Sequence, residues 1–140
     1  MDRSFAQAAA FVFAVVGIAG FFTGDAGTVA NGQAGGNFDG VALHLTYARD
    51  VVDLVLAAAF AYAGLRAGRS LGRTIVLAAG GLLLLLAIVG FVVGDTVDGQ
   101  QSIASLHFPL ATNIFDLVAG TLAVLCGLGG LDDRTAAAAA

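Results

Sequence analysis

The run from Thr74 to Val93 contains twenty residues and no charged side chain. A helix needs about twenty apolar residues to cross the hydrocarbon core of a bilayer, which is about 30 Å thick. Three further stretches dominated by apolar residues are as long or longer, and they cover residues 1–22, 41–65 and 106–128. The pattern therefore predicts four membrane-spanning helices.

The composition agrees with this prediction. Hydrophobic residues make up 59% of the chain, charged residues make up 11%, and the mean hydropathy is +0.92. All six cations are arginines and the net charge is -4, so the chain lacks the basic surface typical of nucleic-acid binding. We expect an all-α, four-helix transmembrane bundle that has the lipid bilayer as its surroundings and no nucleic-acid partner. The single cysteine, Cys126, lies in an apolar run and is expected to be a small buried hydrophobic residue.

Two short patterns occur twice in the chain. The segment GIAGFFTGD at 17–25 returns as AIVGFVVGD at 87–95, at an offset of 70. A second pattern returns at an offset of 63 and aligns His44 with His107, Asp50 with Asn113, and Asp53 with Asp116. We therefore expect the fold to consist of two repeated helical hairpins, within residues 1–69 and 70–131, followed by a short cytoplasmic tail at 132–140.

The first apolar run also fits a signal peptide, in which Arg3 would be the basic n-region. We favour a retained span, because this run contains half of an internal repeat. The second helix is expected to be capped by Asp39, and the fourth helix is expected to have Pro109 as its first residue.

The arginines predict the orientation. Cytoplasmic loops of membrane proteins carry an excess of Lys and Arg. With four spans, the N-terminus, the central loop and the C-terminus lie on one side, and they carry Arg3, Arg66, Arg69, Arg73 and Arg134. The other two loops contain no cation. The expected location is thus the cell membrane, as a multi-pass protein with both termini cytoplasmic.

Charged residues within the spans are the candidate functional residues, because charges inside a bilayer are costly and usually have a role. The predicted intramembrane polar cluster consists of Arg49, Asp50, Asp53, Asn113 and Asp116. Arg49 and Asp53 are four residues apart and can pair along one helix. Small residues share a helical face with each of the two repeat-related aspartates, Asp53 and Asp116, so we expect both to point into the bundle and to share the Arg49 guanidinium.

Two functions are consistent with this cluster. It can hold the two hairpins together, or it can relay protons or cations across the membrane. Two carboxyls that share one guanidinium would repel each other, and we expect one of them to stay protonated near neutral pH.

The repeat-related histidines, His44 and His107, could form an interfacial ligand pair for a metal ion or a haem. Two histidines without further ligands are a small ligand set, and a hydrogen-bonding role is the alternative. No metal or cofactor is predicted. The chain also has no nucleophile–base pattern, phosphate loop or zinc motif, so we do not expect an enzyme.

Two repeated patterns carry a resemblance to a known family: the dipeptides LH, DL and GL within 41–65 and 106–128, and IxGFxxGD at 18–25 and 88–95. Through them the chain resembles the four-span membrane proteins grouped as domain-of-unknown-function family 4383. In that family an Asn followed three residues later by His opens the second and fourth helices. Here Asn113 matches the Asn, Asp50 replaces it in the first repeat, and Asp53 and Asp116 stand where His is expected. The resemblance implies a multi-pass bacterial or archaeal membrane protein and implies no activity.

From these observations we expect a non-enzymatic membrane protein, which serves as a structural or accessory subunit of a homo-oligomer or of a larger membrane complex. The alternative is a small proton or cation transporter or channel that uses Asp53 and Asp116.

Overall fold

The computed structural model describes residues 3–23, 29–30, 33–34, 46–93, 102–103 and 106–129. Within these residues the fold is all-α, as predicted. The four helices are α1 (Arg3–Thr23), α2 (Tyr47–Leu65), α3 (Arg69–Val93) and α4 (Leu110–Gly127). Two short antiparallel strand pairs join β1 (Val29–Ala30) to β2 (Gln33–Ala34) and β3 (Ser102–Ile103) to β4 (Leu106–His107).

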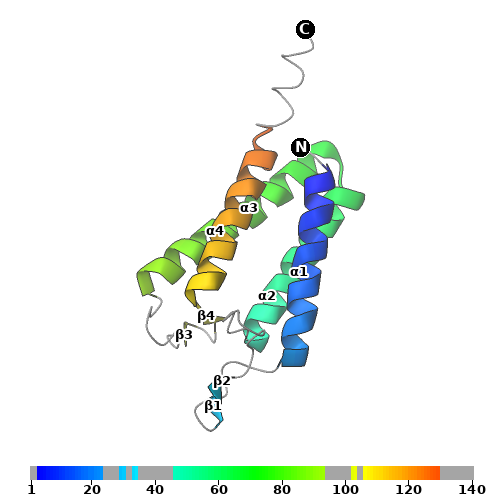
Figure 1. Ribbon diagram of the computed structural model, residues 1–140. Coiled ribbons are helices and arrows are strands. Elements are labelled where there is room, and N and C mark those ends of the chain that lie inside the picture. Colours follow the sequence, from blue (N-terminus) through cyan, green and yellow to red (C-terminus); the bar gives the residue numbers. More distant parts are fainter. Residues whose placement is uncertain are drawn as a thin grey trace.

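The helices are arranged as two adjacent pairs. α1 packs along α2, and α3 packs along α4, whereas α1 and α4 touch only sparsely. The first turn of α1, the α2–α3 connection and the last turn of α4 lie at one end of the molecule (Figure 1). We call this end the arginine end, because the exposed residues Arg3, Arg66, Arg69 and Arg73 lie there.

Two helix starts differ from the sequence-based predictions. The N-cap of α2 is Thr46, whose hydroxyl accepts a hydrogen bond from the Arg49 backbone N–H at 3.2 Å. This bond satisfies one of the backbone donors that lack a partner in the first turn of a helix. Asp39, the predicted cap, lies outside the described residues. Pro109 is the N-cap of α4 and not its first helical residue, because its ψ of 155° is extended.

Three of the four helices are long and apolar enough to cross a membrane: Arg3–Phe22 within α1, the whole of α3 and the whole of α4. α2 has 19 residues and does not belong to this group. The reason is its charge, since Arg49, Asp50 and Asp53 all lie in its first two turns.

Aromatic rings form the centre of the core. Phe13 of α1 stacks on Phe60 of α2 with ring centroids 5.7 Å apart, and it meets Phe115 of α4 edge-on at 5.3 Å. Both Phe13 and Phe60 are buried, and buried alanines surround them. Phe13 therefore contacts both helix pairs.

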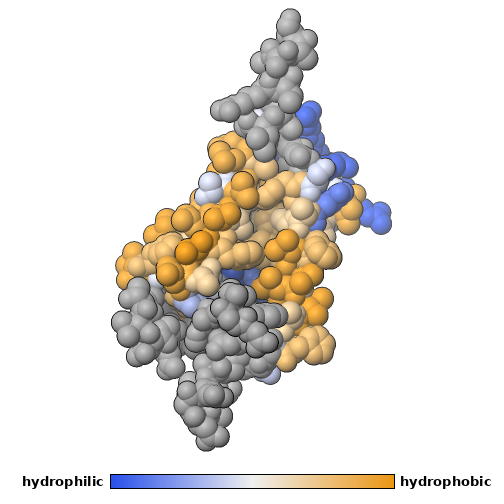
Figure 2. Space-filling model, in the orientation of Figure 1, coloured by the Kyte–Doolittle hydropathy of each residue, from blue (hydrophilic) through white to orange (hydrophobic). Residues whose placement is uncertain are grey.

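On the face shown in Figure 2, the coloured surface is mainly apolar outside the arginine end. Phe22 is 87% exposed, Val92 is 78% exposed and Phe11 is 69% exposed. In contrast, the described acidic residues Asp50, Asp53 and Asp116 are completely buried. Water-soluble domains rarely bury charged side chains completely. This molecule buries its described acids and also exposes many large apolar side chains, while four arginines remain exposed at the arginine end.

Candidate functional site

The candidate site is an ion-pair cluster formed by Arg49, Asp53 and Asp116. Nη1 and Nη2 of Arg49 donate to Oδ2 and Oδ1 of Asp116 at 2.7 and 2.6 Å. Nε of the same guanidinium donates to Oδ1 of Asp53 at 3.0 Å. Two parallel N–H···O bonds to one carboxylate are the strongest geometry that arginine offers, and lysine cannot reproduce it.

Helical spacing positions the members of the cluster. Arg49 and Asp53 are four residues apart and lie on one face of α2, one turn after the Thr46 cap. Asp116 lies in the second turn of α4. Arg49 is 3% exposed and both aspartates are fully buried, so both acids point inward as expected. The ion pair links α2 of the first helix pair to α4 of the second.

The cluster contains more acid than base. One guanidinium faces two carboxyl groups, and three of the four carboxyl oxygens accept bonds from it. The remaining oxygen, Oδ2 of Asp53, is buried and has no hydrogen-bond donor among the described residues. A buried polar atom of this kind is costly unless a proton, a water molecule or another donor satisfies it.

The other two predicted members of the polar cluster lie in tight contacts with glycines. A methyl group added to Gly20 of α1 would overlap the carboxylate of Asp50 on α2. A methyl group added to Gly90 of α3 would likewise overlap the side-chain amide of Asn113 on α4. The glycines are 70 residues apart and the polar residues are 63 apart, which are the offsets of the two sequence repeats.

The side chain of Asn113 also bonds to the backbone just before the start of α4. Its Nδ2 donates to the carbonyl oxygen of Phe108 at 3.0 Å, and its backbone N–H bonds to the carbonyl oxygen of Pro109. Its Oδ1 is buried without a hydrogen-bond partner among the described residues. Asn113 therefore fixes the α4 N-terminus next to the ion-pair cluster.

The predicted histidine pair cannot be placed as a site. His44 lies outside the described residues, and His107 is described only through the backbone of β4. Across the described segments, no group of three or more His, Cys, Asp or Glu side chains could hold a metal ion. Cys126 is buried in α4, as expected. The predicted tail at 132–140 is also outside the described residues.

Two features of the site were not predicted from the sequence: the Thr46 cap and the contacts between glycines and polar side chains. A signal for the second was present, because Gly20 and Gly90 recur together with Asp50 and Asn113. Residues that recur as partners in both halves of a duplicated sequence are candidates for contact within each half.

Comparison with protein-family models, with curated proteins and with solved structures finds no match to this chain. The function must therefore be argued from the geometry of the described residues.

Proposed function

We propose that this chain is a non-enzymatic, multi-pass integral membrane protein made of two repeated helical hairpins, which the ion-pair cluster joins. The observation that carries the proposal is the bidentate salt bridge from Arg49 of α2 to Asp116 of α4, buried in a molecule whose outside is apolar. An exposed apolar surface of this extent favours lipid or another protein as its surroundings.

Membrane insertion of α2 follows from the same pairing. A charged side chain at the centre of a bilayer is expensive, and such residues usually face the interior of a bundle and pair with each other. The three charged residues of α2 are buried, and the exposed residues of this helix include Val51, Val55 and Leu65. α2 thus presents an apolar face outward despite its charges, and we include it as the fourth span.

The proposed role is structural: the chain serves as a subunit of a homo-oligomer or as an accessory subunit of a larger membrane complex. Apart from the two short strand pairs, the described residues are helical or lie in short connections, so little of the described chain is available for chemistry in water. The exposed apolar faces of α1, α3 and α4 offer area for helix–helix contact within a membrane. We also propose that the chain is similar to the four-span membrane proteins of domain-of-unknown-function family 4383, a similarity that implies no activity.

The test compares Asp53→Asn and Asp116→Asn with the unaltered protein, using thermal unfolding in detergent and ion flux in liposomes. A structural role predicts lower stability in Asp116→Asn, which loses one charge of the buried pair, and no flux above that of empty liposomes in any sample. Breaking a buried ion pair by removing one partner costs about 3–5 kcal/mol in proteins. Unchanged stability in both variants would contradict the structural role.

A second candidate function is supported by the excess acid of the cluster. Oδ2 of Asp53 is the carboxyl oxygen that Arg49 leaves free, so it is the atom at which a transported proton or cation would bind. In this case the unaltered protein would show flux in liposomes, and Asp53→Asn would abolish it. Infrared spectroscopy gives an independent measurement, because a carboxyl that holds a proton has a C=O stretching band which Asp53→Asn would remove.

A further inference from the structure

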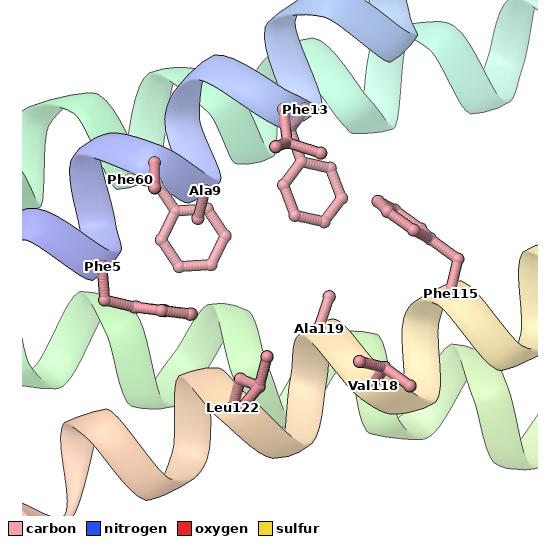
Figure 3. A pocket seen from close by; sticks show the side chains of 10 residues that line it. Phe5, Ala9, Phe13, Phe60, Phe115, Val118, Ala119 and Leu122 are labelled. Atoms are coloured by element: carbon pink, nitrogen blue, oxygen red, sulfur yellow. The ribbon is translucent and has the colours of Figure 1, made fainter. Parts of the chain in front are cut away.

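An apolar groove runs between α1 and α4, and its volume is about 340 Å³. Its lining comes from α1, α4 and one residue of α2, and every lining side chain is apolar. The side chains of Phe5, Phe13, Phe60, Phe115, Ala119 and Leu122 surround it (Figure 3). No described polar group takes part in its wall.

The groove follows from the sequence of the two helices. On α1 it is lined at positions 5, 8, 9, 12 and 13, and on α4 at positions 115, 118, 119 and 122, spacings that keep each set on one helical face. Ala9 and Ala119 are small, and they leave space between helices whose other contacts are sparse. The Phe13–Phe115 ring contact lies at one end of this space, next in sequence to Asp116 (Figure 3).

The dimensions of the groove favour a hydrocarbon chain as the occupant. An α-helix with its side chains is about 10 Å across and would not fit between α1 and α4 without separating them. An apolar cavity of about 150 Å³ already takes up benzene, and this groove has more than twice that volume. Val12, Val118 and Leu122 line it and are exposed, so it is open to the surrounding phase along its length.

The charges at one end of the groove indicate the type of lipid. Phe5 and Leu122 lie toward the arginine end, and Nη2 of Arg3 donates to the Ala67 carbonyl oxygen at 3.1 Å, which ties the first turn of α1 to the α2–α3 connection. This connection and the first two turns of α3 carry Arg66, Arg69 and Arg73, all exposed. Because all the described acids, Asp50, Asp53 and Asp116, are buried, the exposed charge of the described residues is positive.

We propose that the α1–α4 groove binds one acyl chain of an anionic phospholipid, whose phosphate lies at the arginine end. The inference rests on the proposed membrane location. Hydrocarbon in the groove contacts the rings and alanines, while the arginines attract the headgroup. Clusters of arginine and lysine next to membrane spans select anionic lipids in this way.

The test measures lipid retained by the detergent-purified protein after exposure to vesicles of phosphatidylglycerol or of phosphatidylcholine, using native mass spectrometry. Ala119→Phe places a ring in the groove, and Ala78→Phe makes the same change at an exposed position of α3. We expect the unaltered protein and Ala78→Phe to retain phosphatidylglycerol in preference to phosphatidylcholine. Ala119→Phe should lower retention about tenfold, a change that corresponds to about 1.4 kcal/mol.

A combined Arg66→Gln, Arg69→Gln and Arg73→Gln variant tests the headgroup part. It should lose most of its preference for phosphatidylglycerol and still retain lipid, because the groove is intact and Arg3 is the one remaining exposed arginine of this end among the described residues. Equal retention of lipid by Ala119→Phe and the unaltered protein would overturn the proposal, and so would a change in oligomer mass in Ala119→Phe without a change in lipid. Extraction of the protein from membranes by alkaline carbonate would instead refute the membrane location itself, so the two failures are distinguishable.

Discussion

Arg49 is the residue on which the contact between the two helix pairs depends most directly. Among the described residues, Arg49 is the cation whose side chain is buried, and it bonds to one acid from each helix pair. The guanidinium matters as well as the charge, since it presents Nε to one carboxyl and two Nη atoms to the other. A single ammonium group has no such fixed fork.

Replacing this residue gives the first prediction. Arg49→Gln leaves two acids buried without a cation, and we expect it to lower the free energy of unfolding by about 3–5 kcal/mol. Arg49→Lys keeps the charge but loses the bidentate geometry, so its loss should be smaller. Thermal unfolding in detergent micelles, followed by circular dichroism, measures both. Arg73→Gln, at an exposed position, is the control and should change stability by about 0.5 kcal/mol or less.

Gly20 and Gly90 are the second pair of critical residues, and they give the second prediction. Gly20→Ala would push a methyl group into the Asp50 carboxylate, and we expect a loss of roughly 1–3 kcal/mol. Gly81 has open space around its Cβ position, so Gly81→Ala should stabilise α3 by about 0.5–1 kcal/mol. The same unfolding measurement gives opposite signs for the two changes.

A further variant identifies the cause. If overlap with Asp50 is responsible, combining Gly20→Ala with Asp50→Ala should cost less than the sum of the two single changes. Strict additivity would show that Gly20 matters for another reason. Gly90→Ala combined with Asn113→Ala repeats the comparison in the second half of the chain.

One ring of α1 contacts both helix pairs. Phe13 stacks on Phe60 within its own pair and reaches Phe115 across the boundary between the pairs. Phe11 lies on the same helix, is 69% exposed and points away from the core. Comparing substitutions at Phe13 and Phe11 therefore separates the effect of losing core packing from the effect of losing a phenylalanine ring anywhere on the helix.

Truncating these rings gives the third prediction. Phe13→Ala should lower the free energy of unfolding by about 3–5 kcal/mol, because it removes a buried ring from the core and enlarges the groove that the ring lines. Phe11→Ala should change stability little in a micelle, since its ring faces detergent. Equal losses from the two variants, measured by thermal unfolding, would contradict the assignment of Phe13 to the core.

The apolar runs predicted the helices, and their ends differ for local reasons. α3 begins at Arg69, five residues before the predicted start at Thr74. Arg69 and Arg73 lie outside the uncharged run, but arginine is a good helix former and the helix continues through them. α2 starts at Tyr47 because Thr46 caps it. Threonine is a preferred N-cap residue, but the apolar residues from Val41 onward predicted an earlier start.

The candidate site was predictable in part. The salt bridge from Arg49 to both acids could be expected from the i,i+4 spacing and the repeat offset, because few charges lie within the predicted spans and they must find each other. The α1–α4 groove could not be predicted. It depends on the distance between two helices that are not neighbours in the chain, and sequence periodicity shows which residues share a face but not how far apart two faces lie.

At the scale of the whole molecule, the proposed topology has α2 crossing the membrane together with the other three helices. By length and composition alone, Arg3–Phe22 within α1, α3 and α4 are long and apolar enough to cross a membrane. The burial of Arg49, Asp50 and Asp53 removes the objection to α2, because these charges would not meet lipid. If α2 crosses the membrane, the α1–α2 and α2–α3 connections lie on opposite sides. If α2 does not cross, they lie on the same side.

Labelling of single cysteines decides between them and gives the last prediction. Cys126→Ala removes the native thiol, after which Ala30→Cys, Gly68→Cys and Ser102→Cys place one cysteine in each connection. With four spans, a membrane-impermeant maleimide should label positions 30 and 102 in intact cells and should label position 68 only after the membrane is opened. Three spans would put positions 30 and 68 on the same side, so equal labelling at these two sites would contradict the proposed topology. The arginines near position 68 predict that this side is the cytoplasm, and labelling of Gly68→Cys in intact cells would refute that orientation.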